Sequence, residues 1–365
     1  MRKKSDIFIG LMSGTSLDGT DAVACRFEGN EVQFLAHAHL PYSQALRKNL
    51  LGLLTSGSDE INRCGKIGIQ LVHFYARTVD ELLKKLQCKP SEIAAIGVHG
   101  QTIRHCPQSG FTVQLNNPAL LAELTGIDVI ADFRSRDMAA GGEGAPLVPA
   151  FHACIFSAPK ARAIVNIGGI ANVTLLSGNK VLGFDCGPGN TLMDIWVQKH
   201  CGLLFDEDAR WAQKGKINNE LLQALLSDPY FSRKPPKSTG REYFNENWLL
   251  KRYPDLLSLP PEDVQRTLAV LTAQGILRSV NQTQPETKEL FICGGGALNP
   301  LLIEELKKSS YSVQSTMALG VDPMHVESMA FAWLAFRFVN KKAGNLPAVT
   351  RARGERILGA LYPAG

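Results

Sequence analysis

One segment near the start of the chain decides how its fold is interpreted: Gly10-Leu11-Met12-Ser13-Gly14-Thr15-Ser16-Leu17-Asp18-Gly19-Thr20-Asp21. It lies between two short apolar runs, 7–12 and 22–27, which predicts a strand, a tight turn and a second strand. Glycine lacks the Cβ that would keep a phosphate away from the backbone, and Ser and Thr hydroxyls can donate hydrogen bonds to it. Asp18 and Asp21 could hold Mg²⁺ through water. By itself, the segment fits either a phosphate-binding turn or an ordinary hairpin loop.

A second copy of this arrangement favours the phosphate-binding interpretation. Asn166-Ile167-Gly168-Gly169-Ile170-Ala171-Asn172 joins the apolar run 163–167 to the run 170–176. In both halves of the chain a third strand is predicted next, at 32–40 and at 181–184. The repetition predicts an α/β fold with two related mixed-sheet lobes around a central cleft. Each lobe would offer one glycine turn, with its backbone N–H groups, to the phosphates of a nucleotide.

Length and composition fit this organisation. The 365 residues correspond to about two domains. A hydrophobic content of 45% and a charged content of 20% exclude a disordered, collagen-like or coiled-coil chain. The net charge of +5 is too small to indicate nucleic-acid binding. We expect an N-terminal lobe of residues 1–131 closed by 327–365, and a C-terminal lobe of 132–326 with inserted loops at 228–262.

The N-terminus and the cysteines indicate a cytoplasmic protein. The apolar run 7–12 is too short for a signal peptide, and no run approaches 18 consecutive apolar residues. The eight cysteines lie far apart without a C-x-x-C pair, which is typical of reduced thiols rather than zinc ligands. We therefore expect no membrane partner and no nucleic-acid partner.

Two glycine-containing motifs in the second half have open interpretations. Phe184-Asp185-Cys186-Gly187-Pro188-Gly189-Asn190 places a carboxylate at the end of a strand. In a phosphate-binding cleft, a carboxylate is the usual base for a hydroxyl or water, but Asp185 could equally be structural. Cys293-Gly294-Gly295-Gly296-Ala297-Leu298-Asn299-Pro300 could let a nucleoside lie against the backbone, or could serve only close packing of a strand and a helix. It is no dinucleotide fingerprint, because G-x-G-x-x-G would need glycine at 299.

Polar residues at predicted strand ends are candidate substrate contacts, since open α/β sheets bind ligands there. His99, Gln101 and Arg134 suit a polyhydroxylated, carboxylated substrate. Arg134 could instead pair with Asp132 or Asp137.

Glu327 begins the apolar helix predicted at 326–340. The helix dipole alone explains an acidic residue in a first turn, but Glu327 could also help bind a metal ion.

In order along the chain, these motifs resemble the anhydro-N-acetylmuramic acid kinase family of the actin/hexokinase-like superfamily. The resemblance spans residues 10 to about 333 and rests on the segments 10–19, 99–102, 132–134, 144–147, 166–172, 184–190 and 293–299. Cys186 departs from the pattern, because threonine is expected there.

The resemblance implies a kinase that uses ATP and water to open 1,6-anhydro-N-acetylmuramic acid and phosphorylates O6, during peptidoglycan recycling. Asp185 would deprotonate the water, and Glu327 would help hold Mg²⁺. The implied ATP-binding residues are Gly14, Thr15, Ser16, Leu17, Asp18, Gly19, Thr20, Asp21, Asn166, Gly168, Gly169, Asn172, Gly294, Gly295, Gly296 and Asn299. The implied sugar-binding residues are His99, Gln101, Arg134, Gly187 and Asn190. A homodimer is expected from the family.

Two other functions compete with this one. An ordinary amino-sugar 6-kinase would act on a free 6-hydroxyl. A kinase-like sugar-sensing protein would bind without catalysis, and such proteins usually carry an appended helix-turn-helix. The first strand is predicted near residue 7, and no such segment is expected before it.

Overall fold

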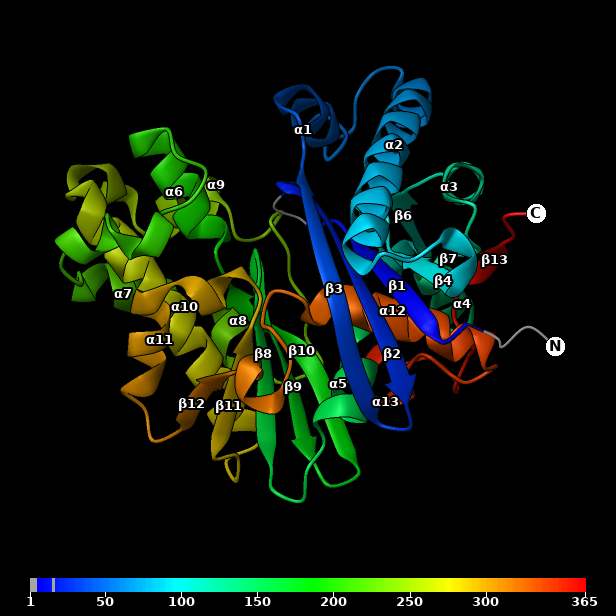
Figure 1. Cartoon of the computed structure of the whole chain (residues 1–365). Coiled ribbons are helices and arrows are strands. Elements are labelled where there is room, and N and C mark those ends of the chain that lie inside the picture. Colours follow the sequence, from blue (N-terminus) through cyan, green and yellow to red (C-terminus); the bar gives the residue numbers. More distant parts are fainter. Residues whose placement is uncertain (1–4, 15–16) are drawn as a thin grey trace. The chain divides into compact units, whose positions relative to one another are not determined.

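The computed structural model describes residues 5–14 and 17–365 and divides into two compact units (Figure 1). The first unit comprises Met1–Ile155 with His325–Gly365, and the second comprises Phe156–Met324. Each unit is built on one mixed β-sheet with helices packed against it, as the α/β prediction requires. Within the described part of the chain, no helix is both long enough and apolar enough to cross a membrane.

The sheet of the first unit has the strand order β13-β7-β4-β1-β2-β3. Its strands are β1 (Ile7–Met12), β2 (Gly19–Glu28), β3 (Glu31–Pro41), β4 (Ile93–Val98), β7 (Val129–Ala131) and β13 (Ala360–Tyr362). β2 is antiparallel to both β1 and β3, whereas β4 is parallel to both β1 and β7. A separate hairpin pairs β5 (Gln101–Cys106) with β6 (Phe111–Leu115).

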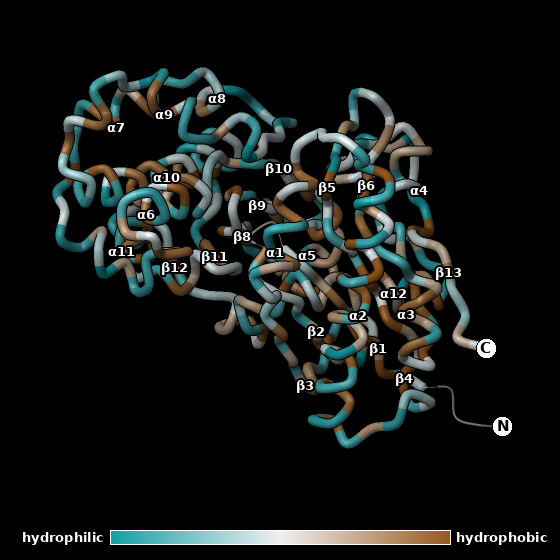
Figure 2. The backbone as a smooth tube through the Cα atoms, turned by 90° about the horizontal axis from the view of Figure 1, so that it is seen from above, coloured by the Kyte–Doolittle hydropathy of each residue, from teal (hydrophilic) through white to brown (hydrophobic). Residues whose placement is uncertain are grey.

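Helices α2 (Glu60–Leu86) and α12 (Val326–Val339) cover opposite faces of this sheet (Figure 1). Successive side chains of a strand point to opposite faces. Leu11 of β1 therefore belongs to the core that contains Tyr75 of α2, whereas the Phe8 ring lies 5.5 Å from the Phe336 ring of α12. Apolar residues accordingly concentrate on β1 and α12 in Figure 2. The shorter helices of this unit are α1 (Gln44–Leu51), α3 (Pro118–Thr125), α4 (Phe133–Ala139), α5 (Val148–Phe156) and α13 (Pro347–Thr350).

Two glycines let α12 lie directly on the sheet. Gly10 of β1 and Gly97 of β4 are neighbours in the parallel pairing. A Cβ at Gly10 would lie 1.8 Å from the carbonyl oxygen of Ser328, and one at Gly97 would lie 2.1 Å from that of Phe331. The contact fixes the first turn of α12, which carries Glu327, against the sheet.

The sheet of the second unit has the strand order β10-β9-β8-β11-β12. Its strands are β8 (Arg162–Ile167), β9 (Ile170–Ser177), β10 (Lys180–Pro188), β11 (Glu289–Cys293) and β12 (Ser312–Ser315). β9 is antiparallel to β8 and β10, whereas β11 is parallel to β8 and β12.

The two sheets therefore share one topology. β8, β9, β10, β11 and β12 correspond in order and direction to β1, β2, β3, β4 and β7. This correspondence confirms the predicted duplication of a mixed-sheet lobe. The cleft that was predicted between the lobes, and their boundaries at residues 131 and 326, stay predictions.

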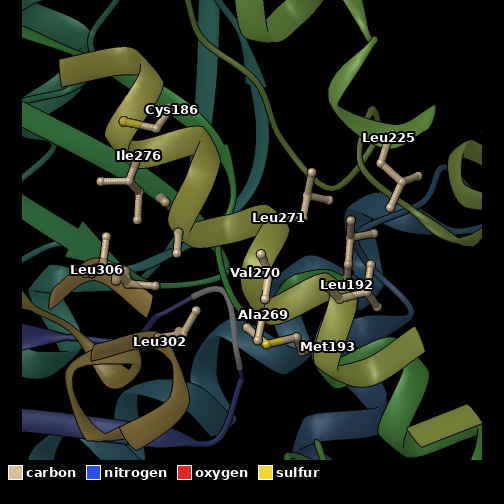
Figure 3. Close-up of a cluster of buried hydrophobic side chains, with 14 of the residues drawn as sticks. Cys186, Leu192, Met193, Leu225, Ala269, Val270, Leu271, Ile276, Leu302 and Leu306 are labelled. Carbon is tan, nitrogen blue, oxygen red and sulfur yellow. The ribbon is translucent and has the colours of Figure 1, made fainter. Parts of the chain in front are cut away.

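Helices of the second unit enclose a large apolar core. They are α6 (Thr191–Cys201), α7 (Asn219–Leu226), α8 (Pro229–Ser232), α9 (Glu246–Arg252), α10 (Pro261–Thr283) and α11 (Pro300–Lys307). Figure 3 shows Leu192 of α6, Leu271 of α10 and Leu302 of α11 among the buried side chains. Cys186 of β10 lies in the same core beside Ile276 of α10 (Figure 3). The core thus extends to the residue that follows Asp185.

The prediction of loops throughout 228–262 is wrong, because α8 and α9 lie within that range. The buried Asp228 explains the order of this segment. Its carboxylate accepts hydrogen bonds from the Tyr230 backbone N–H (2.8 Å), the Tyr243 hydroxyl (2.9 Å) and the Trp248 indole N–H (2.9 Å). One buried carboxylate thereby ties together residues that the proline-rich composition had suggested were irregular.

Replacing Gly97 with alanine should destabilise the protein, because the new Cβ would overlap the α12 backbone. We expect a loss of about 1–3 kcal/mol in the free energy of unfolding, measured with denaturant. Gly65→Ala is the matched control, since a Cβ there meets nothing within 4 Å. In the exposed helix interior that change should stabilise by roughly 0.5–1 kcal/mol. Equal effects of the two substitutions would contradict the close contact.

Candidate functional site

In the first unit, the predicted site residues lie at one edge of the sheet. β1, β4 and β7 are parallel, so their carboxyl ends meet at the same edge. The turn after β1, His99 after β4 and Arg134 after β7 are placed there by topology alone. The His99 backbone N–H donates to the carbonyl of Leu11 at 3.1 Å, which joins the end of β4 to the end of β1.

The described part of the glycine turn is anchored by Leu17. Its side chain is buried, its φ of 55° lies in the left-handed region, and its N–H donates to the Gly14 carbonyl at 3.3 Å. Asp18 is exposed, and its carbonyl accepts from the Tyr42 N–H at 3.0 Å. The predicted contacts Thr15 and Ser16 lie outside the described residues.

Buried hydroxyl pairs fix both ends of the turn. The Ser13 hydroxyl lies 2.7 Å from the Tyr75 hydroxyl, and Thr20 donates to the Tyr42 hydroxyl at 3.0 Å. Burial raises the pKa of Tyr42 to about 12, so its phenol stays neutral at physiological pH. The side chain of Thr20 is therefore engaged beneath the turn.

Asp21 is held by two histidines on β3. Its Oδ1 lies 2.9 Å from His37 Nε2 and 3.0 Å from His39 Nδ1. Burial alone would raise the pKa of Asp21, but hydrogen bonds with both histidines outweigh it and lower the pKa to about 2. The hydrogen bond with Asp21 in turn raises the pKa of His39. Gly19 makes room for the pair, since a Cβ there would lie 2.6 Å from the His39 ring.

His99 and Arg134 form a buried pair beside α12. Arg134 Nε and Nη2 lie 3.1 and 2.9 Å from His99 Nε2, and Nη1 donates to the Gly144 carbonyl at 2.8 Å. Burial, followed by the charge of Arg134, lowers the pKa of His99 well below its usual value. The imidazole is therefore neutral, with Nε2 as acceptor and its proton on Nδ1. Asp137 accepts instead from Thr350 Oγ1 and Asn345 Nδ2, both at 2.7 Å.

Two polar atoms in this cluster lack a hydrogen-bond partner within the described part of the chain. They are Nδ1 of His99 and Oε1 of Gln101, and both are buried. A backbone hydrogen bond with Gly100, whose geometry is too poor to satisfy Nδ1, opposes the lowering of the His99 pKa. Glu327 lies in the first turn of α12. Burial lowers the pKa of Arg134 to about 10, and the charge of Glu327 opposes that shift, so the two groups act on each other. His99, Arg134 and Glu327 thus interact with one another, and Gln101 follows His99 by two residues. Shifted pKa values of this kind are common at functional sites.

In the second unit, three polar residues and a cysteine form a row across four strands. Asp185 of β10 pairs with Asn172 of β9, Asn172 with Asn166 of β8, and Asn166 with Cys293 of β11. Directly paired residues present their side chains on the same face. The candidate base and two predicted ATP contacts are therefore neighbours by register.

The Gly168-Gly169 turn binds the segment after β10. The Gly169 carbonyl accepts from the N–H groups of Gly189 (2.9 Å) and Thr191 (3.1 Å), and the Gly168 carbonyl accepts from that of Asn190 (2.8 Å). Asn190 Nδ2 also donates to the Ile167 carbonyl at 3.3 Å. The turn therefore holds the start of α6 in place.

Gly187 has a φ of 146°, and a Cβ there would lie 2.8 Å from the Phe231 ring. Only glycine fits this position without displacing that ring.

The glycine run serves close packing at two of its three positions. A Cβ at Gly294 would lie 2.3 Å from Asn166 Oδ1, and one at Gly296 would lie 2.3 Å from Ile167 Cγ2. At Gly295 the nearest atom would be 3.7 Å away, so this backbone has room beside it. Asn299 accepts from the N–H groups of Leu301 and Leu302 at 3.1 and 3.2 Å and thus caps α11.

Sequence reasoning missed the residues that hold Asp185. Its Oδ2 accepts from the Thr239 N–H at 3.0 Å, its N–H donates to the Lys237 carbonyl at 3.1 Å, and its carbonyl accepts from the Tyr230 hydroxyl at 2.9 Å. All three partners come from the segment predicted as loop. The sequence gives no sign that Lys237 is buried, because lysine side chains are usually exposed.

Asp21→Asn tests the histidine pair through the pH dependence of stability. The raised pKa of His39 means that its pairing stabilises the fold fully below about pH 6.5 and is lost as the pH rises through the folded-state value. The lowered pKa of Asp21 keeps the carboxylate ionised across that window. The difference in free energy of unfolding between wild type and Asp21→Asn, from denaturant titrations, should be larger at pH 6 than at pH 8.5. A difference independent of pH would exclude the assigned pairing.

Comparisons with known proteins show the family to which the chain belongs. The family model "Anhydro-N-acetylmuramic acid kinase" matches residues 6–364. An anhydro-N-acetylmuramic acid kinase from Burkholderia ambifaria is 51% identical over 98% of this chain and 96% of its own length. One from Pseudomonas paraeruginosa is 52% identical over 98% and 99%. Among solved structures, the activator of the 2-hydroxyisocaproyl-CoA dehydratase from Clostridium difficile with bound ADPNP matches with a TM-score of 0.47 and 13% identity, covering 92% of this chain and 96% of that one. On the family match and the two close relatives, the chain belongs to the anhydro-N-acetylmuramic acid kinase family.

Proposed function

We propose that this chain opens 1,6-anhydro-N-acetylmuramic acid with water and transfers the γ-phosphoryl group of ATP to O6, within cell-wall recycling in the bacterial cytoplasm. Family membership supports the kinase activity and the use of ATP and an amino sugar. The observation that carries the mechanism is the carboxylate of Asp185, held near the carboxyl end of β10 in a row with Asn172 and Asn166.

The reaction couples ring opening to phosphoryl transfer. Asp185 takes a proton from water, and the water oxygen forms a bond to the anomeric carbon. The bond from that carbon to O6 breaks, and O6 attacks the γ-phosphorus, with ADP as leaving group. The anhydro sugar has no free 6-hydroxyl, so cleavage has to accompany transfer. A general base of this kind contributes about 10²–10⁴ in rate, and positioning with charge neutralisation supplies much of the rest.

The nucleotide contacts are assigned to backbone more than to side chains. Several side chains of the predicted set already bind protein atoms: Thr20 to Tyr42, Asp21 to two histidines, and Asn299 to the first turn of α11. We propose that Gly14, the backbone of 15–20, the Gly168-Gly169 turn and Gly295 approach the phosphates and nucleoside. Close approach to a phosphate favours glycine and backbone N–H groups.

The sugar contacts are assigned to His99, Gln101 and Arg134, with Gly187 and Asn190. A buried polar atom without a partner is uncommon in a folded protein. Nδ1 of His99 offers a donor and Oε1 of Gln101 an acceptor, which suits the hydroxyl and amide groups of an amino sugar. Arg134 supplies a fixed positive charge for the carboxylate of the substrate.

A magnesium ion fits this chemistry through its phosphate ligands. Within residues 5–14 and 17–365, no group of three or more His, Cys, Asp or Glu side chains is arranged to hold a metal. Mg²⁺ bound to a nucleotide needs only one or two protein carboxylates. We assign that role to Glu327, with the exposed Asp18 as a second carboxylate. When bound, the ion would neutralise charge on the transferring phosphoryl group.

We also propose a homodimer, which light scattering of the purified protein tests.

Asp185→Asn should lower kcat by at least about 10²-fold with the fold intact, because the amide cannot accept the proton of water. Turnover is measured as ADP formed with the anhydro sugar, and folding by circular dichroism. Asp255→Asn, at an exposed position of the same unit, is the control and should keep wild-type turnover. Near-full activity of folded Asp185→Asn would remove Asp185 from the role of base.

Turnover in ¹⁸O-water separates this reaction from its rivals. Hydrolytic opening should place the label on the anomeric oxygen of the product, after correction for slow exchange, and leave O6 unlabelled. An ordinary amino-sugar 6-kinase would incorporate none. A sugar-sensing protein without catalysis would bind the sugar, measured by calorimetry, and form no ADP.

A further inference from the structure

Hydrogen bonds close a ring around the backbone of Asp185. The Asp185 N–H donates to the Lys237 carbonyl (3.1 Å), Lys237 Nζ donates to the Tyr230 carbonyl (3.2 Å), and the Tyr230 hydroxyl donates to the Asp185 carbonyl (2.9 Å). β10 is the edge strand of its sheet and has a register shift between Asp185 and Gly187. The segment 230–239 therefore binds the Asp185 backbone N–H and carbonyl, which β10 does not pair with a second neighbouring strand.

Lys237 is buried at the centre of this ring. Its side chain is only 5% exposed, and its ammonium lies 4.8 Å from the centre of the Tyr230 ring and 5.9 Å from that of Phe184. Two aromatic faces and one carbonyl stabilise a cation in a place where water cannot. Burying a lysine is costly unless its charge has a use or a partner.

The charged and titratable groups around Lys237 come from β10 and from α8 with the residue that follows it. Burial lowers the pKa of Lys237, and the negative forms of Cys186 and Asp185 on β10 oppose that shift. Arg233, which follows α8, lowers it further. Tyr230 of α8 contributes a phenol whose pKa is raised by burial and by Asp185. Burial also raises the pKa of the Cys186 thiol to about 12, so that thiol stays neutral. Asp185 is therefore the anion on which the ammonium of Lys237 acts.

We propose that Lys237 is a positioning residue that holds Asp185 in place through the ring and keeps its carboxylate ionised for proton abstraction. The inference rests on the proposed function, in which Asp185 is the base. The hydrogen bonds to the backbone N–H and carbonyl of Asp185 fix the position of its carboxylate. The ammonium of Lys237 favours the ionised form of that carboxylate. Thr239, two residues further along, orients Oδ2 by its N–H.

The pH profile of kcat distinguishes this role from a merely structural one. Lys237→Met should move the acidic limb up by about one pH unit, because the variant lacks the positive charge that favours the ionised carboxylate of Asp185. kcat should then fall about tenfold on the acidic limb and recover toward wild type at high pH. Lys237→Arg keeps the charge and should leave the limb near its wild-type position. Lys234→Met, at an exposed position of the same segment, should change nothing.

Two further measurements keep the test decisive. If Lys237 acts through Asp185, adding Lys237→Met to Asp185→Asn should lower the turnover of Asp185→Asn by less than about twofold, whereas Lys237→Met in the wild-type background should show its full loss on the acidic limb. A pH-independent loss of kcat in folded Lys237→Met, or an acidic limb that does not move, overturns the proposal. High activity of Asp185→Asn overturns the assignment of the base instead, so the two failures are distinguishable. If Lys237→Met does not fold, the limb of Lys237→Arg decides: a shift of a full pH unit there contradicts the charge role.

Discussion

Parallel pairing at the centre of each sheet is the constraint on which the candidate site depends. β1 pairs parallel with β4, and β8 pairs parallel with β11, while a hairpin partner lies on the other side of β1 and of β8. The hairpin turn and the carboxyl ends of the parallel strands then meet at one edge of each sheet, whatever side chains they carry. Residues far apart in sequence, such as Leu11 and His99, become hydrogen-bonded neighbours there. Polar chemistry accumulates at that edge because the strands themselves are buried and apolar.

An edge strand gives Asp185 its distinctive environment. β8 and β11 have strands on both sides, so their backbone groups are taken up by the sheet. β10 has a neighbouring strand on one side only, and the segment 230–239 binds the backbone of Asp185 on the other side. Unpaired strand edges are usually covered in natural proteins, since they otherwise pair with other chains. Here the covering segment also brings an ammonium group and an N–H donor to the one carboxylate that the chemistry needs.

Much of the fold could be predicted from periodicity and turn residues, because they are local signals. The hairpins 7–27 and 163–176 and the duplication of the lobe follow from apolar runs around glycine turns. β5 and α4 were missed, since 101–106 alternates weakly and Phe133-Arg134-Ser135-Arg136 carries mostly polar residues. The helices within 228–262 could not be predicted from the sequence. They depend on the buried Asp228 and on Tyr243 and Trp248, which come together only in the folded chain.

The structure sorts the predicted site residues by what their polar atoms already bind. The Thr20 hydroxyl donates to Tyr42, and the Asn299 side chain accepts from the first turn of α11. The fold alone therefore explains both side chains. His99 and Gln101 each keep one buried polar atom without a partner in the described part of the chain, although each residue is almost fully enclosed. Leaving such an atom unpaired costs about 1–3 kcal/mol. A ligand that supplied hydrogen bonds to these two atoms would recover that cost. Spacing alone could not make that distinction, because all four side chains stand at strand ends or in turns.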